Sequence, residues 1–170
     1  LLLSGPAGGL TAIQFLGRQI GNEKLISFDM GGTSTDVALI DGKINTTIEG
    51  QIERYPIGVP MVDMHTIGAG GGSIAFVDSG GMLKVGPHSA GADPGPACYA
   101  KGGEVATVTD ANLVLGRLLV STALAGSLTL SLAKSKSAIK ALGEVLGMCI
   151  EETALGIITI ANEHMAKAIR

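Results

Sequence analysis

The sequence predicts an α/β fold with a mixed sheet that starts as a three-stranded antiparallel meander and is flanked by helices. Two apolar runs, residues 25–29 and 37–40, enclose a glycine-rich hexapeptide, which is the pattern of a β-hairpin. Asp41-Gly42 is a two-residue turn signal, and residues 43–48 then alternate as a third strand. Helical periodicity before and after this region predicts the flanking helices.

A first helix is predicted just before the hairpin. Ser4-Gly5-Pro6 resembles a helix start, with proline in the first turn, where its missing N–H costs nothing, and Gly21-Asn22 is a typical stop. Gly8 and Gly9 in the first turns cost about 1 kcal/mol each relative to alanine. We therefore expect something to come close to this backbone, such as a hinge or a ligand.

The last third of the chain is predicted to be helical. Thr107–Asp110 gives a short strand and a helix cap before a helical stretch over 111–118. Longer helices are expected over 131–146 and 151–170, and the second is apolar all round in its middle, which must be covered. The uncharged run 118–133 is interrupted by polar residues and is shorter than the ~20 apolar residues of a bilayer span. We expect a buried strand or loop there and no membrane anchor.

These patterns divide the chain into three segments, a hairpin core over 1–50, a Gly/Pro-rich loop region over 51–106 and a helical part over 107–170. Prolines stiffen the apolar loop 86–99, so we expect it to pack in one conformation. The chain opens without a methionine and ends within a helical pattern at Arg170. We therefore expect a piece of a longer protein.

Composition narrows the classes of function. Charged residues make up 16% of the chain and the 26 glycines are about twice the ordinary share, which indicates a buried, loop-rich protein. A net charge of −3 without basic clusters argues against nucleic acid as a partner. Cys98 and Cys149 are isolated thiols, which suit small core positions in a protein of the reducing cytoplasm.

The hexapeptide of the hairpin has the composition of an anion-binding loop. Gly31 and Gly32 lack Cβ atoms, so the chain can turn with positive φ and bring backbone N–H groups within reach of a ligand's oxygens. Hydroxyl groups add further donors, from Thr33, Ser34 and Thr35. Such a loop suits phosphate groups.

Two aspartates bound this hexapeptide. Asp29 and Asp36 supply the hard oxygen ligands that Mg²⁺ takes, directly or through water. Anion donors beside such carboxylates suit a magnesium nucleotide. The alternative is a tight hairpin whose Asp and Thr side chains only satisfy their own turn.

Two later features could contact a substrate or the same ligand. Asp63 and His65 are two residues apart, a spacing that puts both on one face of a strand, either as a metal or acid–base pair or as a satisfied core pair. Gly70, Gly71 and Gly72 form a second place where the backbone can approach a ligand, or else a flexible turn.

Five segments of the chain resemble the hydantoinase A/5-oxoprolinase family of the actin-like ATPase superfamily. They are SGPAGG at 4–9, FDMGGTSTD at 28–36, TIGAGGGSI at 66–74, SAGADPGPACY at 89–99 and TVTDANLVLGRL at 107–118. The resemblance implies an RNase-H-like α/β lobe, the second-lobe portion of an ATPase domain, whose hairpin is the second of two phosphate loops. It also implies ATP-dependent opening of a cyclic amide of the hydantoin or 5-oxoproline type, by phosphorylation of the amide oxygen, in partnership with a hydantoinase B-type subunit or domain.

The same resemblance implies roles for the hairpin residues. It assigns the β and γ phosphates of ATP to four of them, Gly31, Gly32, Thr33 and Ser34. Asp29 would hold Mg²⁺ through water, and Asp36 would orient or deprotonate the attacking group. An earlier phosphate loop in a first lobe and a later adenosine-binding segment are also implied, and neither occurs within residues 1–170. We therefore expect these 170 residues alone to be inactive and to self-associate.

Two other functions fit the same loops. The equivalent subunit of an ATP-dependent ketone carboxylase shares them and differs in substrate. A non-enzymatic ATPase module would use the nucleotide only to switch conformation for a partner. Product analysis separates these hypotheses, because only an enzyme of the first kind couples ATP consumption to ring opening.

Overall fold

The chain forms two compact units in the computed structural model, which describes residues 4–48, 50–52, 55–58, 60–121 and 128–170. Unit 1 comprises Leu1–Asp29 and Asp36–Thr66, and unit 2 comprises Met30–Thr35 and Ile67–Arg170. The chain leaves unit 1 and returns to it within the hairpin.

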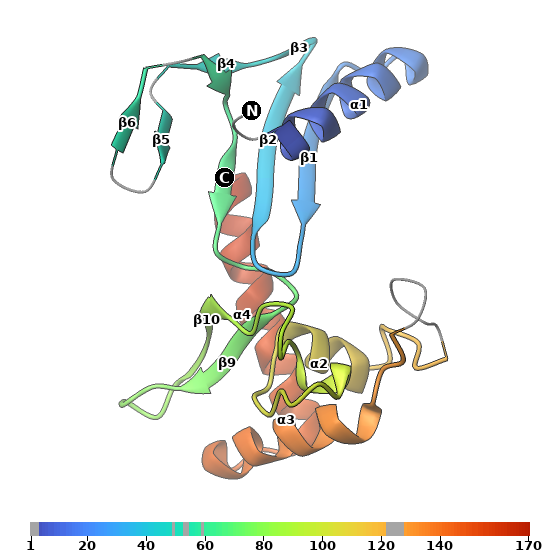
Figure 1. Cartoon of the computed structure of the whole chain (residues 1–170), viewed down its shortest axis with the longest axis vertical. Coiled ribbons are helices and arrows are strands. Elements are labelled where there is room, and N and C mark those ends of the chain that lie inside the picture. Colours follow the sequence, from blue (N-terminus) through green and yellow to red (C-terminus); the bar gives the residue numbers. More distant parts are fainter. Residues whose placement is uncertain (1–3, 49, 53–54, 59, 122–127) are drawn as a thin grey trace. The chain divides into compact units, whose positions relative to one another are not determined.

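Unit 1 is a helix packed on a small sheet (Figure 1). The sheet has the order β1-β2-β3, and β8 also pairs with β2. The elements are α1 (Ser4–Ile20), β1 (Lys24–Met30), β2 (Thr35–Asp41), β3 (Lys43–Ile44) and β8 (His65–Ile67). Two antiparallel ladders join β4 (Thr46–Thr47) to β7 (Met61–Val62) and β5 (Gly50–Ile52) to β6 (Tyr55–Ile57). The predicted order of helix and hairpin is confirmed.

Helix α1 packs against the sheet through a narrow apolar stripe. Leu10 is buried in a cluster with Ala38 and Ile40 of β2. Gly17 permits a close approach to β1, because a Cβ at this position would lie 2.5 Å from Cδ1 of Leu25. These contacts fix α1 along one face of the sheet, with its C-terminal half close to β1.

The third predicted strand is split. Gly42 turns with φ 70°, as its turn signal predicts. The chain then pairs with β2 over β3 only, while β4 pairs with β7 in a separate ladder. The prediction of one strand over 43–48 is therefore wrong, because a period-two pattern does not reveal that the chain changes its pairing partner at Asn45.

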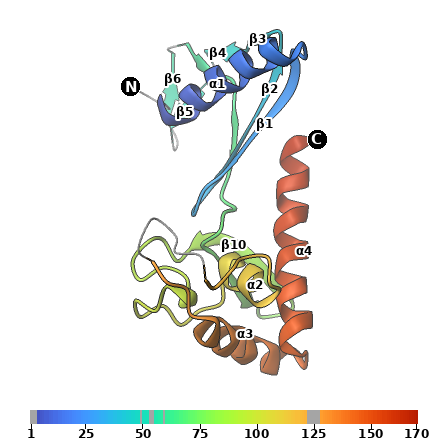
Figure 2. The same cartoon turned by 90° about the vertical axis from the view of Figure 1, so that its right-hand side faces the viewer.

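Unit 2 packs helices against a two-stranded antiparallel ladder (Figure 2). Its elements are β9 (Ser73–Val77), β10 (Leu83–Ser89), the 3₁₀ helix η1 (Ala97–Tyr99), α2 (Val108–Val114), α3 (Leu132–Leu146) and α4 (Ile150–Ile169). Helices α2 and α3 both contact α4. Residues 86–89, predicted as part of a loop, continue β10 past an irregularity in its register. The later part of that loop packs tightly, since Ala97 and Cys98 of η1 are buried.

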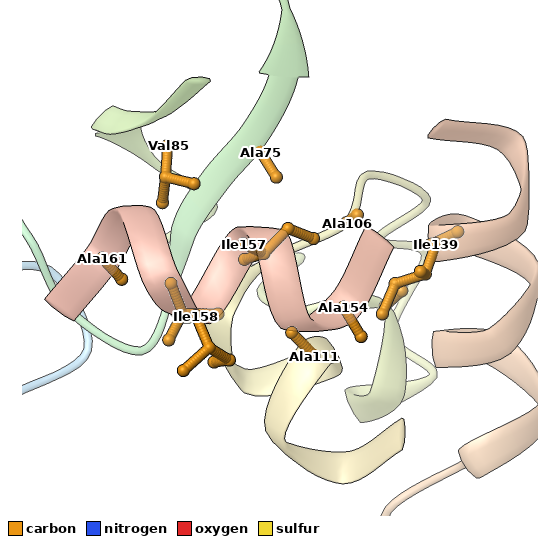
Figure 3. Close-up of a cluster of buried hydrophobic side chains, with 12 residues drawn as sticks. Ala75, Val85, Ala106, Ala111, Ile139, Ala154, Ile157, Ile158 and Ala161 are labelled. Carbon is orange, nitrogen blue, oxygen red and sulfur yellow. The ribbon is translucent and has the colours of Figure 1, made fainter. Parts of the chain in front are cut away.

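The core of unit 2 is built on α4 (Figure 3). Ala154, Ile157 and Ile158 of α4 are buried in one cluster with Ile139 of α3 and Val85 of β10. Burying a large aliphatic side chain contributes about 1.5–3 kcal/mol. One side of the apolar middle of α4 is thereby covered, whereas Leu155 on another side is 53% exposed, so the predicted cover is only partly present.

A buried carboxylate joins α2, α3 and η1. Asp110 has no exposed surface. Its oxygens accept hydrogen bonds from the backbone N–H groups of Ala97, Cys98 and Thr107 and from the hydroxyl groups of Thr107 and Ser135, at 2.7–3.2 Å. These five donors replace the hydrogen bonds to water that the carboxylate loses on burial.

The start of α2 differs from the sequence prediction. Thr107 caps the helix, and its side chain and that of Asp110 form a reciprocal capping box. The predicted short strand is reduced to one antiparallel β-bridge between Thr107 and Ile74. The helix spans Val108–Val114 instead of 111–118, because Gly116 with φ 70° ends it early.

The two cysteines differ in environment. Cys98 is buried as predicted, and this burial, with the nearby Asp110 carboxylate, raises the pKa of its thiol from 9.0 to about 12. Cys149 is exposed, so its predicted core position is wrong. It caps α4 through a sulfur contact with the N–H of Glu152, and the N–H of Cys149 donates to the Glu152 carboxylate and lowers the pKa of that group.

The run 118–133 lies partly outside the described residues. Where it is described, Leu130 is buried in a cluster with Cys98 and Leu113. None of the described helices is long and apolar enough to span a membrane.

Candidate functional site

The hairpin loop of unit 2 presents unused backbone donors. The N–H of Gly31 donates to the carbonyl oxygen of Ser34 at 2.8 Å and closes the loop. Within the described part of the chain, the N–H groups of Gly32, Thr33 and Ser34 have no acceptor. The predicted positive φ is wrong for Gly31 and Gly32, because this hydrogen bond closes the loop without a left-handed residue.

Gly32 borders empty space. No heavy atom lies within 4 Å of an ideal Cβ at this position. Neither packing nor backbone conformation therefore requires a glycine here. A ligand that comes close to the backbone, next to the three unused N–H groups, would need the space that a side chain at this position fills, and this is a physical reason for a glycine.

The triple glycine supports this loop. The N–H of Gly71 donates to the carbonyl oxygen of Gly31 at 3.0 Å, and that of Gly72 donates to the carbonyl oxygen of Gly32 at 2.6 Å. A Cβ at Gly70 would lie 2.7 Å from the carbonyl oxygen of Gly31. The close approach that these glycines predict is to the hairpin loop, and it occupies the N–H groups of Gly71 and Gly72.

Thr35 anchors the loop from within. Its side chain is fully buried, and Oγ1 donates to the carbonyl oxygen of Ala69 at 2.6 Å. The predicted contribution of this hydroxyl to the ligand is therefore wrong. Thr33 is exposed and Ser34 is half-buried, so their hydroxyl groups remain accessible.

The two predicted carboxylates meet in unit 1. Asp29 and Asp36 line one cavity of about 230 Å³. Thr66 Oγ1 donates to Oδ1 of Asp36 at 2.5 Å, while no described residue donates to the carboxylate of Asp29. The sequence analysis missed Thr66, because its contact depends on the pairing of β8 with β2 and has no local signal.

The rest of the cavity wall is mainly apolar. It is formed by Pro6, Gly9, Leu10, Ile13, Ser27, Phe28 and Met64. None of the lining residues is Lys, Arg or His. The cavity thus combines two carboxylates with a wall suited to hydrocarbon.

Asp63 and His65 do not share a strand. β7 ends before Asp63 and β8 begins at His65, and both side chains are exposed, so the core-pair alternative is wrong. Among the described residues no group of three or more His, Cys, Asp or Glu side chains could hold a metal ion. Substrate contact by either side chain stays a prediction.

The residues present fit a magnesium nucleotide. The unused N–H groups and the open space at Gly32 suit phosphate oxygens. Mg²⁺ keeps several waters and needs only one or two carboxylates besides phosphate, and Asp29, which is exposed, would supply one such carboxylate. The absence of a larger acidic cluster in the described residues is compatible with this donor set.

The geometry defines an α/β protein with an exposed glycine-rich donor loop and a carboxylate-lined cavity. The chain belongs to the hydantoinase/oxoprolinase family, whose model matches residues 1–170, and the resemblance in the sequence is thereby confirmed. It is 48% identical over 169 residues to the alpha subunit of caprolactamase from Pseudomonas jessenii. This match covers 98% of the present chain and 24% of that subunit.

Two further similarities broaden the comparison. The chain is 45% identical over 189 residues to the 5-oxoprolinase PfmaA of Pestalotiopsis fici, covering 99% of this chain and 14% of that protein. A nucleotide-free structure of acetone carboxylase, from a study of ATP-dependent acetone carboxylation, matches with a TM-score of 0.90 and 34% identity over 99% of this chain and 24% of that one. The chain spans a quarter or less of the length of these relatives.

Proposed function

We propose that the protein containing this chain opens a cyclic amide with the use of ATP, by phosphorylating the amide oxygen. The observation that carries the proposal is the hairpin loop, in which three N–H groups lack an acceptor beside the open Gly32. The 48% identity to a caprolactamase subunit and the 45% identity to a 5-oxoprolinase support a cyclic amide as substrate.

We assign the chain to the second lobe of an RNase-H-like ATPase domain. The helix-to-hairpin order and the long match to acetone carboxylase support this assignment. The caprolactamase relative of this chain is an alpha subunit, and alpha subunits have partner subunits. We therefore expect a second subunit or domain of the hydantoinase B type as the partner of this protein.

Each hairpin residue then has a role. Of the four residues Gly31, Gly32, Thr33 and Ser34, the last three hold the β and γ phosphates through their unused N–H groups, and Gly31 closes the loop that presents these groups. Asp29 would hold Mg²⁺ through water, and the ion would neutralise phosphate charge. Asp36 orients the amide or removes its proton, and Thr66 fixes the Asp36 carboxylate. Such positioning and charge neutralisation account for most catalysis of phosphoryl transfer.

The test is turnover by the full-length protein with its partner subunit. Ring opening of caprolactam, hydantoin or 5-oxoproline is measured together with ADP release. Asp36→Ala should lower kcat by about 10²–10⁴-fold, the usual worth of a positioned base, with little change in nucleotide affinity. Asp41→Ala is the matched control, because Asp41 is exposed at the far end of β2 and does not line the cavity.

Other outcomes identify other functions. ATP hydrolysis without ring opening of any amide indicates a nucleotide switch. ATP-dependent carboxylation of acetone or acetophenone indicates a ketone carboxylase, which the TM-score of 0.90 to acetone carboxylase makes the second candidate. Equal losses in turnover and nucleotide affinity in Asp36→Ala contradict the role of Asp36 as a base.

A further inference from the structure

We propose that the cavity between α1, β1 and β2 in unit 1 is the subsite for the carbonyl substrate, which it binds by its apolar side with the reacting amide at Asp36. This inference rests on the proposed function for the phosphoryl donor. It adds the place where the amide binds and the residues that select it.

The cavity wall favours a small molecule with a hydrocarbon body. Pro6, Leu10 and Ile13 of α1 and Met64 before β8 provide apolar surface. With about 230 Å³, the cavity is close to the lower end of ligand pockets, which suits one small ring. The lining contains no basic residue and no unused backbone donor of the loop, so this space is suited to the hydrocarbon body of the substrate, whereas the phosphates of the nucleotide have their donors at Gly32, Thr33 and Ser34.

Asp36 is the polar contact at which the amide reacts. Thr66 occupies Oδ1 of Asp36 and fixes the carboxylate, so Oδ2 is the oxygen left for a ligand. An amide N–H in the cavity donates to that oxygen while the apolar ring lies against α1. A ketone would place an α-hydrogen at the same point.

The reaction balances with ATP as the second substrate. The amide oxygen forms a bond to the γ phosphorus, the bond from that phosphorus to the β–γ bridging oxygen breaks, and ADP leaves. The proton on the amide nitrogen passes to the Asp36 carboxylate. The product of this step is an O-phosphorylated imidate, and the step needs no oxidant. Ring opening then consumes water and releases phosphate.

Gly9 explains why the subsite lies beside α1. This residue lines the cavity, and no atom lies within 4 Å of an ideal Cβ there. None of the described residues is therefore the close neighbour that the glycine predicts, and a ligand in the cavity can take that place. Gly8 has the same empty surroundings but does not line the cavity. A helix normally disfavours both glycines by about 1 kcal/mol each, so at Gly9 substrate access accounts for that cost.

The test compares Gly9→Leu with Gly8→Leu in the full-length protein with its partner subunit. Gly9→Leu should raise KM for caprolactam and hydantoin by about tenfold or more, the range that a few methylenes in a pocket produce. KM for ATP should stay within about twofold. Gly8→Leu should leave both constants unchanged, and circular dichroism should show both variants folded.

Two results overturn the subsite. Gly9→Leu could leave KM for the amide unchanged, or it could raise KM for ATP as much as KM for the amide, which would place the nucleotide in the cavity. If the wild type opens no amide, the proposed function fails separately. The subsite is then tested by calorimetric titration with caprolactam and acetophenone, and equal binding by wild type and Gly9→Leu contradicts it.

Discussion

Thr66 donates a hydrogen bond of 2.5 Å from Oγ1 to Oδ1 of Asp36 across the pairing of β8 with β2. The two residues are thirty positions apart in the sequence. One oxygen of the carboxylate is thereby held by the protein, and the other is free to face the cavity that Asp36 lines. The orientation of the proposed base thus depends on a strand that sequence analysis did not connect with it.

Thr66→Val should lower kcat by about 10- to 100-fold, because a hydrogen bond to a charged group is worth about 1.5–3 kcal/mol. Thr66→Ser keeps the hydroxyl and should restore most of the rate. Steady-state kinetics with varied pH check the reason for the loss. A positioning role moves the acidic limb of the kcat profile in Thr66→Val, whereas a purely structural role lowers kcat without moving that limb.

Gly32→Val should abolish nucleotide-dependent turnover and leave the protein folded. A Cβ at Gly32 meets no protein atom within 4 Å and needs no positive φ, but a side chain there fills the space next to the unused N–H groups. Calorimetry with Mg-ATP and circular dichroism measure the two properties.

Gly70→Val is the matched comparison. A Cβ at Gly70 lies 2.7 Å from a backbone oxygen of the loop, so this variant should lose about 1–3 kcal/mol of stability. An unfolded Gly32→Val protein would show that Gly32 serves the turn and not a ligand.

Asp110→Asn should destabilise the protein by about 2–6 kcal/mol, because two buried N–H groups lose their acceptor at about 1–3 kcal/mol each. An amide nitrogen in place of Oδ2 would face the N–H groups of Ala97 and Thr107, which then lose their acceptor. Urea unfolding measures the change. A shift below 1 kcal/mol would show that water replaces the carboxylate.

The two thiols should react at different rates. At pH 8 the exposed Cys149 should react with a thiol reagent in the native protein, and Cys98 should react only after unfolding, because its thiol is buried and its pKa is raised to about 12. Rapid modification of both cysteines in the folded protein would contradict this burial.

The same thiol makes stability depend on alkaline pH. The pKa of Cys98 is higher in the folded chain than its ordinary value of 9.0. The contribution of the protonated thiol to the free energy of unfolding is therefore complete below pH 9 and is lost as the pH rises toward about 12. Cys98→Ala should flatten this part of the stability profile. Urea midpoints between pH 8 and pH 11 give the measurement.

A polypeptide of these 170 residues should self-associate, bind Mg-ATP weakly or not at all, and open no amide. On α1, Phe15, Leu16 and Ile20 are 61%, 57% and 71% exposed, and such contiguous apolar surface is unfavourable in a monomer. Sedimentation and calorimetry test the prediction. A monomer with micromolar ATP affinity would show that the site is complete within these residues.

The sequence by itself determined the local elements and the glycine-rich donor loop of the hairpin. Pro6 and Gly21 mark α1, Gly42 marks the turn after β2, and two aspartates bound a donor loop. These features depend on neighbouring residues, because caps, turns and loops are set by short-range hydrogen bonds and by φ. The family resemblance depended on the same short segments.

Only the tertiary structure decided which partners these residues meet. The split of the third strand, the contact of Thr66 with Asp36 and the packing of Gly70 on Gly31 all join segments far apart in the sequence. Thr35 and Gly32 have similar local surroundings, yet one is fully buried and the other borders empty space. Composition does not reveal that difference, because burial and free donors depend on how distant strands and loops pack together.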